Sequence, residues 1–271
     1  MYFVAMVVKL KLQNPQLKLT VAHAVYAHAA ILSAITKLNA EVGRELHEMH
    51  RNKRISIALI DNVKDSATLR LTFTAEEGLA YAHLLVNRFI TCPMLRLGNV
   101  ICDVDVVNLA DPDWAGVSTW SDFVDHHENS LQFRFITPTA ITKRGRGNTR
   151  YVSLYPDPLS VFSGLARRWQ ALDGPKLPND LEDFIEGGGC VVSRHQLQTI
   201  EFNIERHTQI GFVGRVVYEC RKTDRIEYIA ALNALARLAP FTGVGYQTAR
   251  GMGAVRVTTS KSRGDHGMDG D

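Results

Sequence analysis

The densest concentration of side chains able to do chemistry lies between residues 44 and 54. Basic residues and two histidines gather there: Arg44, His47, His50, Arg51, Lys53 and Arg54. His50 follows His47 by one helical turn, so we expect the two on one helical face. A histidine titrates near neutral pH and serves as acid or base, and nearby cations favour an anionic ligand. A solvated surface explains the cluster equally well, and the residues alone leave both interpretations open.

The same segment approaches a zinc pattern without completing it. His47-Glu48-Met49-His50 is one residue short of HExxH, and no motif supplies a third ligand. The four cysteines (Cys92, Cys102, Cys190 and Cys220) form no CxxC pair. We therefore expect no metal, no other cofactor, and reduced thiols in a cytoplasmic protein.

A glycine-rich stretch near the C-terminus, Gly243-Val-Gly-Tyr-Gln-Thr-Ala-Arg-Gly-Met-Gly253, is the second candidate site. Its glycines (Gly243, Gly245, Gly251 and Gly253) permit backbone conformations that a Cβ would block, and a close approach of phosphate to backbone amides. Arg250 adds a positive charge. No GxxxxGK[ST] pattern is present, and the stretch does not follow a strand and open a helix, which disfavours a dinucleotide site. A tight helix-to-strand connection is the plainer interpretation.

A second basic cluster contains Lys143, Arg144 and Arg146 among glycines and polar residues. We expect a flexible loop, and if it neutralises phosphates of a nucleic acid, the affinity should depend on salt. The overall charge of +3 is too small to indicate nucleic acid by itself. A hydrophobic content of 45% fits a globular protein, and no apolar run reaches the roughly 20 residues of a membrane-spanning helix.

Periodicity predicts a recurring order of elements. The N-terminal stretch of residues 1–12 is predicted to be a strand, because its apolar and lysine residues alternate over 8–12. A helix follows, with an apolar face of Val25, Ala29, Leu32, Ile35 and Leu38. A short helix over 41–49, strands over 55–60 and 69–73, a helix to about residue 89 and a strand over 100–107 complete the first half. Thr74 and Glu77 form a capping-box signature at the start of the second long helix.

The second half repeats the order. A strand contains Leu131, Phe133 and Phe135, and Asp157-Pro158 marks a helix start. Two β-rich segments (190–205 and 210–220), a helix capped by Asp224 and a strand over 254–257 follow. The chain is thus predicted to be α+β, with two tandem ferredoxin-like βαββαβ domains packed side by side. We expect the domains at 1–109 and 130–258, a connection at 110–129 and a disordered tail at 259–271.

With this order in place, GVGYQTARGMGAVRV resembles the terminal glycine-rich motif of the CRISPR precursor-RNA processing endoribonucleases, which belong to the repeat-associated RNA-binding superfamily. Supporting matches include Leu46-His47-Glu48, the segment 135–139, Pro156-Asp157-Pro158, Trp169 and Gly211-Phe212-Val213-Gly214. The resemblance runs from about residue 3 to residue 258, and only the C-terminal motif is specific.

The resemblance implies metal-independent cleavage of CRISPR repeat RNA in the precursor transcript, giving mature guide RNA. A ribose 2′-hydroxyl attacks the adjacent phosphate and leaves a 2′,3′-cyclic phosphate and a 5′-hydroxyl. It implies His47 as the catalytic histidine and Lys53 as the accompanying lysine. His50, one helical turn after His47, is a rival or assistant by its spacing. Some members use a tyrosine on the first helix, where this sequence has Leu32.

The implied RNA contacts are Arg51, Arg54, Lys143, Arg144, Arg146, Arg250 and the four glycines Gly243, Gly245, Gly251 and Gly253. The alternative is a non-catalytic RNA-binding subunit, partnered by the other subunits of a CRISPR effector complex. No membrane partner is expected. The sequence leaves open whether the protein forms a homodimer.

Overall fold

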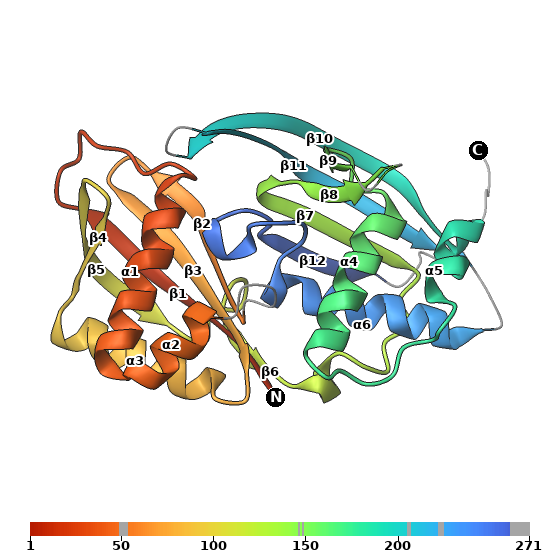
Figure 1. Ribbon diagram of the computed structural model, residues 1–271, viewed down its shortest axis with the longest axis horizontal. Coiled ribbons are helices and arrows are strands. Elements are labelled where there is room, and N and C mark those ends of the chain that lie inside the picture. Colours follow the sequence, from red (N-terminus) through yellow and green to blue (C-terminus); the bar gives the residue numbers. More distant parts are fainter. Residues whose placement is uncertain (49–53, 146, 148, 205–206, 222–224, 261–271) are drawn as a thin grey trace, which may run out of the picture.

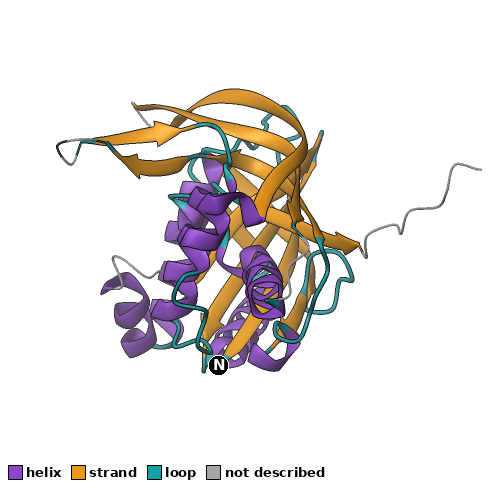
Figure 2. Ribbon diagram, turned by 90° about the vertical axis from the view of Figure 1, so that its right-hand side faces the viewer, coloured by secondary structure: helices purple, strands orange, loops and turns teal. Residues whose placement is uncertain are grey.

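The computed structural model describes residues 1–48, 54–145, 147, 149–204, 207–221 and 225–260. Two units lie side by side, each with helices on one face of an antiparallel sheet (Figures 1 and 2). None of the helices described is long and apolar enough to cross a membrane.

The first unit has a sheet in the order β2-β3-β1-β5-β4 with antiparallel neighbours. Its strands are β1 (Tyr2–Leu12), β2 (Ile55–Val63), β3 (Ser66–Ala75), β4 (Met94–Leu97) and β5 (Val100–Asn108). Its helices are α1 (His23–Leu38), α2 (Ala40–Glu48) and α3 (Gly78–Thr91). The predicted elements are all present, and the short strand β4, which pairs with β5, was not predicted.

The second unit has the equivalent order, β10-β11-β7-β12. Its strands are β7 (Ser130–Thr139), β10 (Cys190–Ile204), β11 (His207–Cys220) and β12 (Val255–Ser260), with a separate hairpin of β8 (Ile141–Arg144) and β9 (Arg150–Ser153). Its helices are α4 (Pro158–Ala171), α5 (Leu181–Phe184) and α6 (Ile226–Thr242). The two units therefore share the strand order of the ferredoxin-like fold, which confirms the predicted fold class.

Strand β1 explains how the units are joined. Its alternate residues Val4, Met6 and Val8 face the core of the first unit, whereas Phe3 belongs to the core of the second. The Phe3 ring packs against Trp120 and Phe123, with centroid distances of 4.7 and 4.6 Å. Strand β1 thus contributes side chains to both cores, and burial of these apolar side chains holds the units together.

The predicted connection at 110–129 is more regular than expected. A short strand, β6 (Gly116–Ser118), pairs with β1, and a 3-10 turn (Trp120–Asp122) follows. The buried Arg70 of β3 donates from Nε to the Trp114 carbonyl at 2.8 Å and from Nη1 to the Pro240 carbonyl at 2.7 Å. One side chain therefore ties the first sheet to both the connection and the end of α6.

Two predicted helix starts have different outcomes. Asp157 caps α4, because its Oδ1 accepts from the Ser160 amide at 2.9 Å, with Pro158 in the first turn. The capping box at Thr74 is wrong: Thr74 lies in β3, paired with Phe3, and α3 begins at Gly78 without a side-chain cap. Pairing with β1 through Ala75 extends the strand past the local helix signal. Asp224 lies outside the described residues, and α6 begins at Ile226.

The predicted apolar face of α1 is partly displaced. Ala24, Ala27, Ile31, Leu32 and Ile35 are the buried positions. Leu38, predicted to be in the core, is 44% exposed at the end of the helix. The buried stripe therefore follows Ala27–Ile31–Ile35 and excludes the last turn.

Candidate nucleic-acid interface

The glycine-rich loop (residues 243–253) connects α6 to β12 and is held mainly by its own backbone. The Val244 amide donates to the Gly253 carbonyl at 2.9 Å, and the Gly253 amide donates to the Pro138 carbonyl at 3.0 Å. The Tyr246 amide donates to the Ala140 carbonyl at 3.1 Å. These amides are committed to the fold and do not point at a ligand.

Each of the four glycines also has a packing reason to be glycine. All four have positive φ, between 71° at Gly243 and 96° at Gly251. A Cβ on Gly245 would collide with the Ala140 carbonyl, and one on Gly251 would collide with Ala24 of α1. The glycine spacing is therefore explained by the loop's fit against β7 and α1, and contact of these glycines with RNA stays a prediction.

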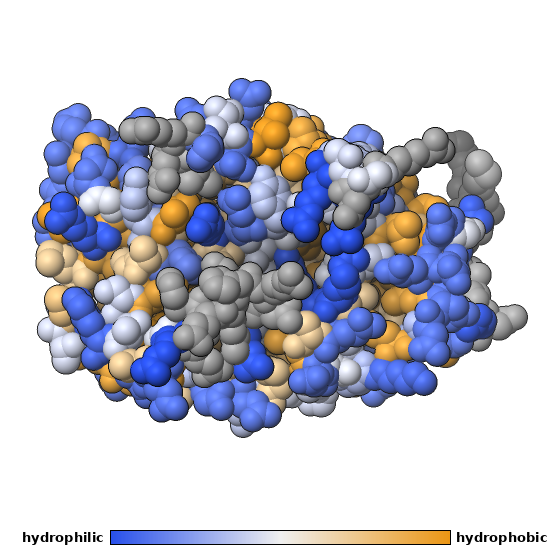
Figure 3. Space-filling view, in the orientation of Figure 1, coloured by the Kyte–Doolittle hydropathy of each residue, from blue (hydrophilic) through white to orange (hydrophobic). Residues whose placement is uncertain are grey.

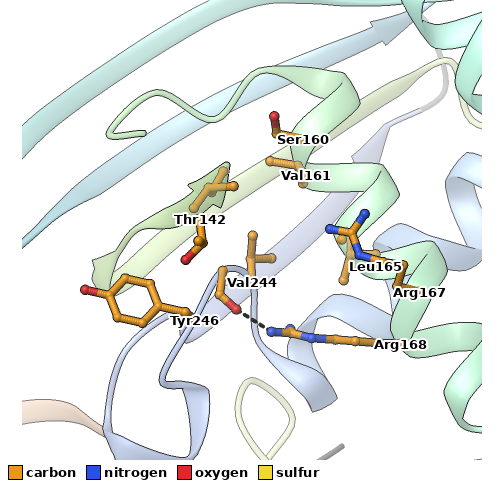
Figure 4. Close-up of a pocket in the computed structure, with 11 residues that line it drawn as sticks. Thr142, Ser160, Val161, Leu165, Arg167, Arg168, Val244 and Tyr246 are labelled. Atoms are coloured by element: carbon orange, nitrogen blue, oxygen red, sulfur yellow. Dashed lines mark hydrogen bonds between the residues drawn. The ribbon is translucent and has the colours of Figure 1, made fainter. Parts of the chain in front are cut away.

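Arg168 of α4 holds the start of the glycine-rich loop in place. Its guanidinium donates to the carbonyls of Thr242 (3.1 Å), Gly243 and Gly245, and Figure 4 shows it reaching the loop. Burial, reinforced by the charge of Arg167, lowers the pKa of Arg168 to about 10. The side chain thus stays protonated at neutral pH and clamps three carbonyls at once.

The far end of the loop docks on the first unit. Its 3-10 turn η4 (Thr248–Arg250) lies against β2, where the Ser56 hydroxyl donates to the Thr248 carbonyl at 3.2 Å. A groove of about 820 Å³ opens between α1, α2 and this turn. Its polar lining comes from all three: His28, Ser33 and Thr36 of α1, Arg44 of α2, and Arg250 of the loop.

This groove brings two separately predicted sites together. Arg250 and Arg44 are exposed, one from the glycine-rich loop and one from the basic segment 44–54. Leu32, which stands where some family members have a tyrosine, is a buried wall of the groove. His28 is one turn away on the same helix and was not predicted. Only the packing of α2 on α1 identifies it.

The predicted catalytic residues are only partly described. His47 lies in α2, next to the groove residue Leu46, and the structure gives its place in that helix alone. His50, Arg51 and Lys53 lie outside the described residues. Arg54 is half-buried immediately before β2. The roles of these residues stay predictions.

A nearby histidine, His23, has a well-defined environment at the start of α1. The Thr20 amide donates to its Nδ1 at 3.0 Å. Burial lowers the pKa of His23, opposed in part by hydrogen bonds with Thr20 and Asn99. The imidazole is therefore held as a neutral acceptor that orients the helix start.

The basic cluster at 143–146 is not wholly a flexible loop, because Lys143 and Arg144 lie in β8. Lys143 Nζ contacts Asp157 Oδ2 at 2.5 Å, so it supports the cap of α4, whereas Arg144 is exposed. Arg146 lies outside the described residues. Strongly hydrophilic side chains run down this face over the β8–β9 hairpin and α4 (Figure 3).

Strand register creates a cationic row that was not predicted. Arg134 of β7 pairs directly with Arg215 of β11 on one side and with Arg256 of β12 on the other. Directly paired residues project from the same face, and like charges so placed repel each other. Arg134 and Arg215 are exposed, while Arg256 pairs with Asp113 and lies over the Trp114 ring. Such a row suits a polyanion.

Within the described part of the chain, no three His, Cys, Asp or Glu side chains are grouped as a metal site would require. The four cysteines are free thiols, three of them buried.

This chain is similar to known proteins in sequence and in structure. A family model described as CRISPR-associated endoribonuclease Cas6 matches residues 133–255. A Cas6 endoribonuclease of Mycobacterium tuberculosis is 33% identical over 130 residues, which cover 47% of this chain and 38% of that protein. One of Streptococcus thermophilus is 22% identical over 150 residues, covering 54% and 58%. The matches thus span less than two thirds of these relatives.

Solved structures match over nearly the whole chain. A Cas6 product complex has a TM-score of 0.81 and 25% identity, covering 94% of this chain and 100% of that one. A second Cas6 product complex has a TM-score of 0.73 and 26% identity, covering 96% and 100%. A structure described as an RAMP protein binding different RNA substrates, at 15% identity and a TM-score of 0.62, shares the fold.

Proposed function

Because this chain is related in sequence and in fold to the Cas6 family of CRISPR-associated endoribonucleases, we propose that it binds CRISPR repeat RNA and cuts it within the precursor transcript. The observation that carries the proposal is the groove between α1, α2 and the glycine-rich loop, which is lined by Arg44 from one unit and Arg250 from the other. Two cations and a histidine around one groove are suited to an RNA phosphate.

The proposed reaction is a transesterification. A ribose 2′-hydroxyl loses its proton to a base and attacks the adjacent phosphorus, while the bond to the 5′-oxygen breaks and that oxygen takes a proton from an acid. The products are a 2′,3′-cyclic phosphate and a 5′-hydroxyl. His47 serves as base or acid, because a histidine imidazole can both accept and donate a proton.

Cations near the groove stabilise the negative charge that develops on the phosphorane. Arg250 and Arg44 line the groove, and Lys53 and Arg51 follow α2 in the chain. His50 is the alternative proton carrier. The reaction needs no metal ion, because the attacking hydroxyl belongs to the RNA itself.

Other cations hold the flanking RNA. Arg54 and Arg144 lie on the two units, and Arg146 follows Arg144 in the chain. The four glycines Gly243, Gly245, Gly251 and Gly253 contribute indirectly, because they let the loop fit against its neighbours and so present Arg250 to the RNA.

The proposal is tested by incubating the purified protein with its cognate repeat RNA in excess EDTA. We expect one cut, with a cyclic phosphate on the upstream product and a hydroxyl on the downstream one. A requirement for a divalent ion, or a 3′-hydroxyl product, would contradict the mechanism. Tight binding without cleavage under all conditions would instead select a non-catalytic RNA-binding subunit of an effector complex.

A further inference from the structure

The glycine-rich loop borders a second cavity, formed with α4 and β8 and about 300 Å³ in volume (Figure 4). Its floor is apolar and comes from every element around it: Ile141, Val161, Leu165 and Val244. This volume is at the lower end of the range for small-molecule pockets. The cavity therefore has room for a single planar group, and a double helix is too wide to enter it.

The polar groups around the cavity stand at its edges. Figure 4 shows the Tyr246 ring at one end and the Arg167 guanidinium at the other, with Thr142 and Val244 between them. Tyr246 is positioned in advance, because its hydroxyl donates to Gln209 Oε1 at 2.6 Å and its amide is bound by Ala140. Arg167 is exposed, whereas its neighbour Arg168 is occupied with the loop carbonyls.

We propose that this cavity binds one unstacked nucleobase of the RNA, with Arg167 contacting a neighbouring phosphate. An apolar floor, an aromatic wall and a cation at the edge match the base and phosphate of a single nucleotide. Residues 244–246 of the loop line this cavity and Arg250 lines the groove. An RNA strand that crosses the loop reaches both the cavity and the groove. A base held in the cavity would therefore fix the position of the RNA in the groove.

This inference rests on the proposed function, and Gly164 allows a test that separates the two. Gly164 lies in α4 and lines the cavity. A Cβ added there would approach only Arg167 Nη2, at 3.9 Å. Gly164→Leu should thus fill the cavity without disturbing the fold, and Gly164→Ala is the matched control that leaves it open. Alanine and leucine both favour a helix over glycine, so the melting temperature should not fall.

Binding is measured with repeat RNA carrying a 2′-deoxy nucleotide at the cut site, intact or with one abasic nucleotide at each position in turn. We expect Gly164→Leu to weaken binding about 10-fold or more and Gly164→Ala less than about 2-fold. One abasic position should weaken wild-type binding about 10-fold and have no further effect in Gly164→Leu, since both remove the same contact.

Equal affinity of the two Gly164 variants, or fully multiplicative losses at every abasic position, would overturn the nucleobase site while leaving the endoribonuclease proposal intact. Tyr246→Ala should weaken binding about as much as Gly164→Leu, and Tyr246→Phe should weaken it much less, because the ring remains for stacking and only its bond to Gln209 is lost. Failure of the wild-type protein to bind repeat RNA would overturn the proposed function itself.

Discussion

The two units have the same sheet order but differ in the connections between helix and strand. In the first unit, α1 leads to β2 through α2 and the basic segment that follows it. In the second, α6 leads to β12 through the glycine-rich loop, which crosses to the first unit and packs on β2 and α1. The repeated sheets supply the scaffold, and the two connections that are not repeated line the groove together.

The groove therefore depends on how the two units are joined as much as on the structure of either unit. Arg70 and Phe3 fix the joint from the first sheet, and Arg168 fixes the loop from the second unit. A change at the joint should therefore affect the groove even when it lies far from the RNA.

The largest effect on stability is expected from Arg70→Met. It removes the two charged hydrogen bonds to the Trp114 and Pro240 carbonyls, so the free energy of unfolding should fall by about 3–4 kcal/mol. Urea denaturation measures it. Arg88→Met is the control, because Arg88 donates to the Cys92 carbonyl within its own unit. This substitution should lower the free energy of unfolding by about 1 kcal/mol. Equal losses would mean that the joint is not special.

Gly251→Ala should lower the free energy of unfolding by about 2 kcal/mol, because the new Cβ would clash with Ala24 of α1 and the residue has a φ of 96°. It should also slow RNA cleavage, since the turn that carries Arg250 must shift. Gly164→Ala, in a helix with open space around it, should not destabilise the protein. Unchanged stability and cleavage in Gly251→Ala would show that the loop does not need its fit against α1.

The secondary structure was largely predictable, because alternation and three-to-four spacing reflect burial that the strands and helices achieve locally. Asp157 shows this, since its cap is a contact within one turn. Thr74 shows the limit: its capping signature is local, but pairing of β3 with β1 is stronger and distant in the chain. Periodicity cannot supply such register.

The site was less predictable for the same reason. The sequence identifies Arg250 and the basic segment separately, and only packing makes Arg250 and Arg44 line the same groove. Arg134, Arg215 and Arg256 become one row only through strand pairing. The glycine spacing indicated phosphate binding, whereas the clash at Gly251 involves Ala24 at the other end of the chain.

Two predicted helix starts, one in each unit, offer a smaller test. Asp157→Ala should cost about 1 kcal/mol, while Thr74→Val should change stability by less than about 0.5 kcal/mol, because Thr74 is not a cap. Burial opposes ionisation of Asp157, but hydrogen bonds from Lys143 and Ser160 outweigh it and lower its pKa. Its stabilisation is thus present above its unfolded-state pKa and is lost as the pH falls through the folded one. Acid unfolding of Asp157→Asn should lack this component, and an unchanged acid midpoint would contradict it.

The smallest effect is expected from the arginine row. Replacing Arg134 and Arg215 with glutamine should reduce the slope of log affinity against log salt by about 1.4, if both neutralise phosphates of a single strand. Lys64→Gln with Arg96→Gln, two exposed cations of the first unit, is the control. Equal slopes in both variants would remove the row from the RNA interface.

We propose above that His47 of α2 transfers a proton during RNA cleavage at the groove between α1, α2 and the glycine-rich loop. The most direct measurement is the single-turnover cleavage rate of His47→Ala in EDTA, with RNA affinity measured on the same preparation. We expect a rate lowered by about 100- to 10,000-fold with RNA affinity nearly unchanged. A rate within a few-fold of wild type would contradict it, and would move the proton transfer to another residue.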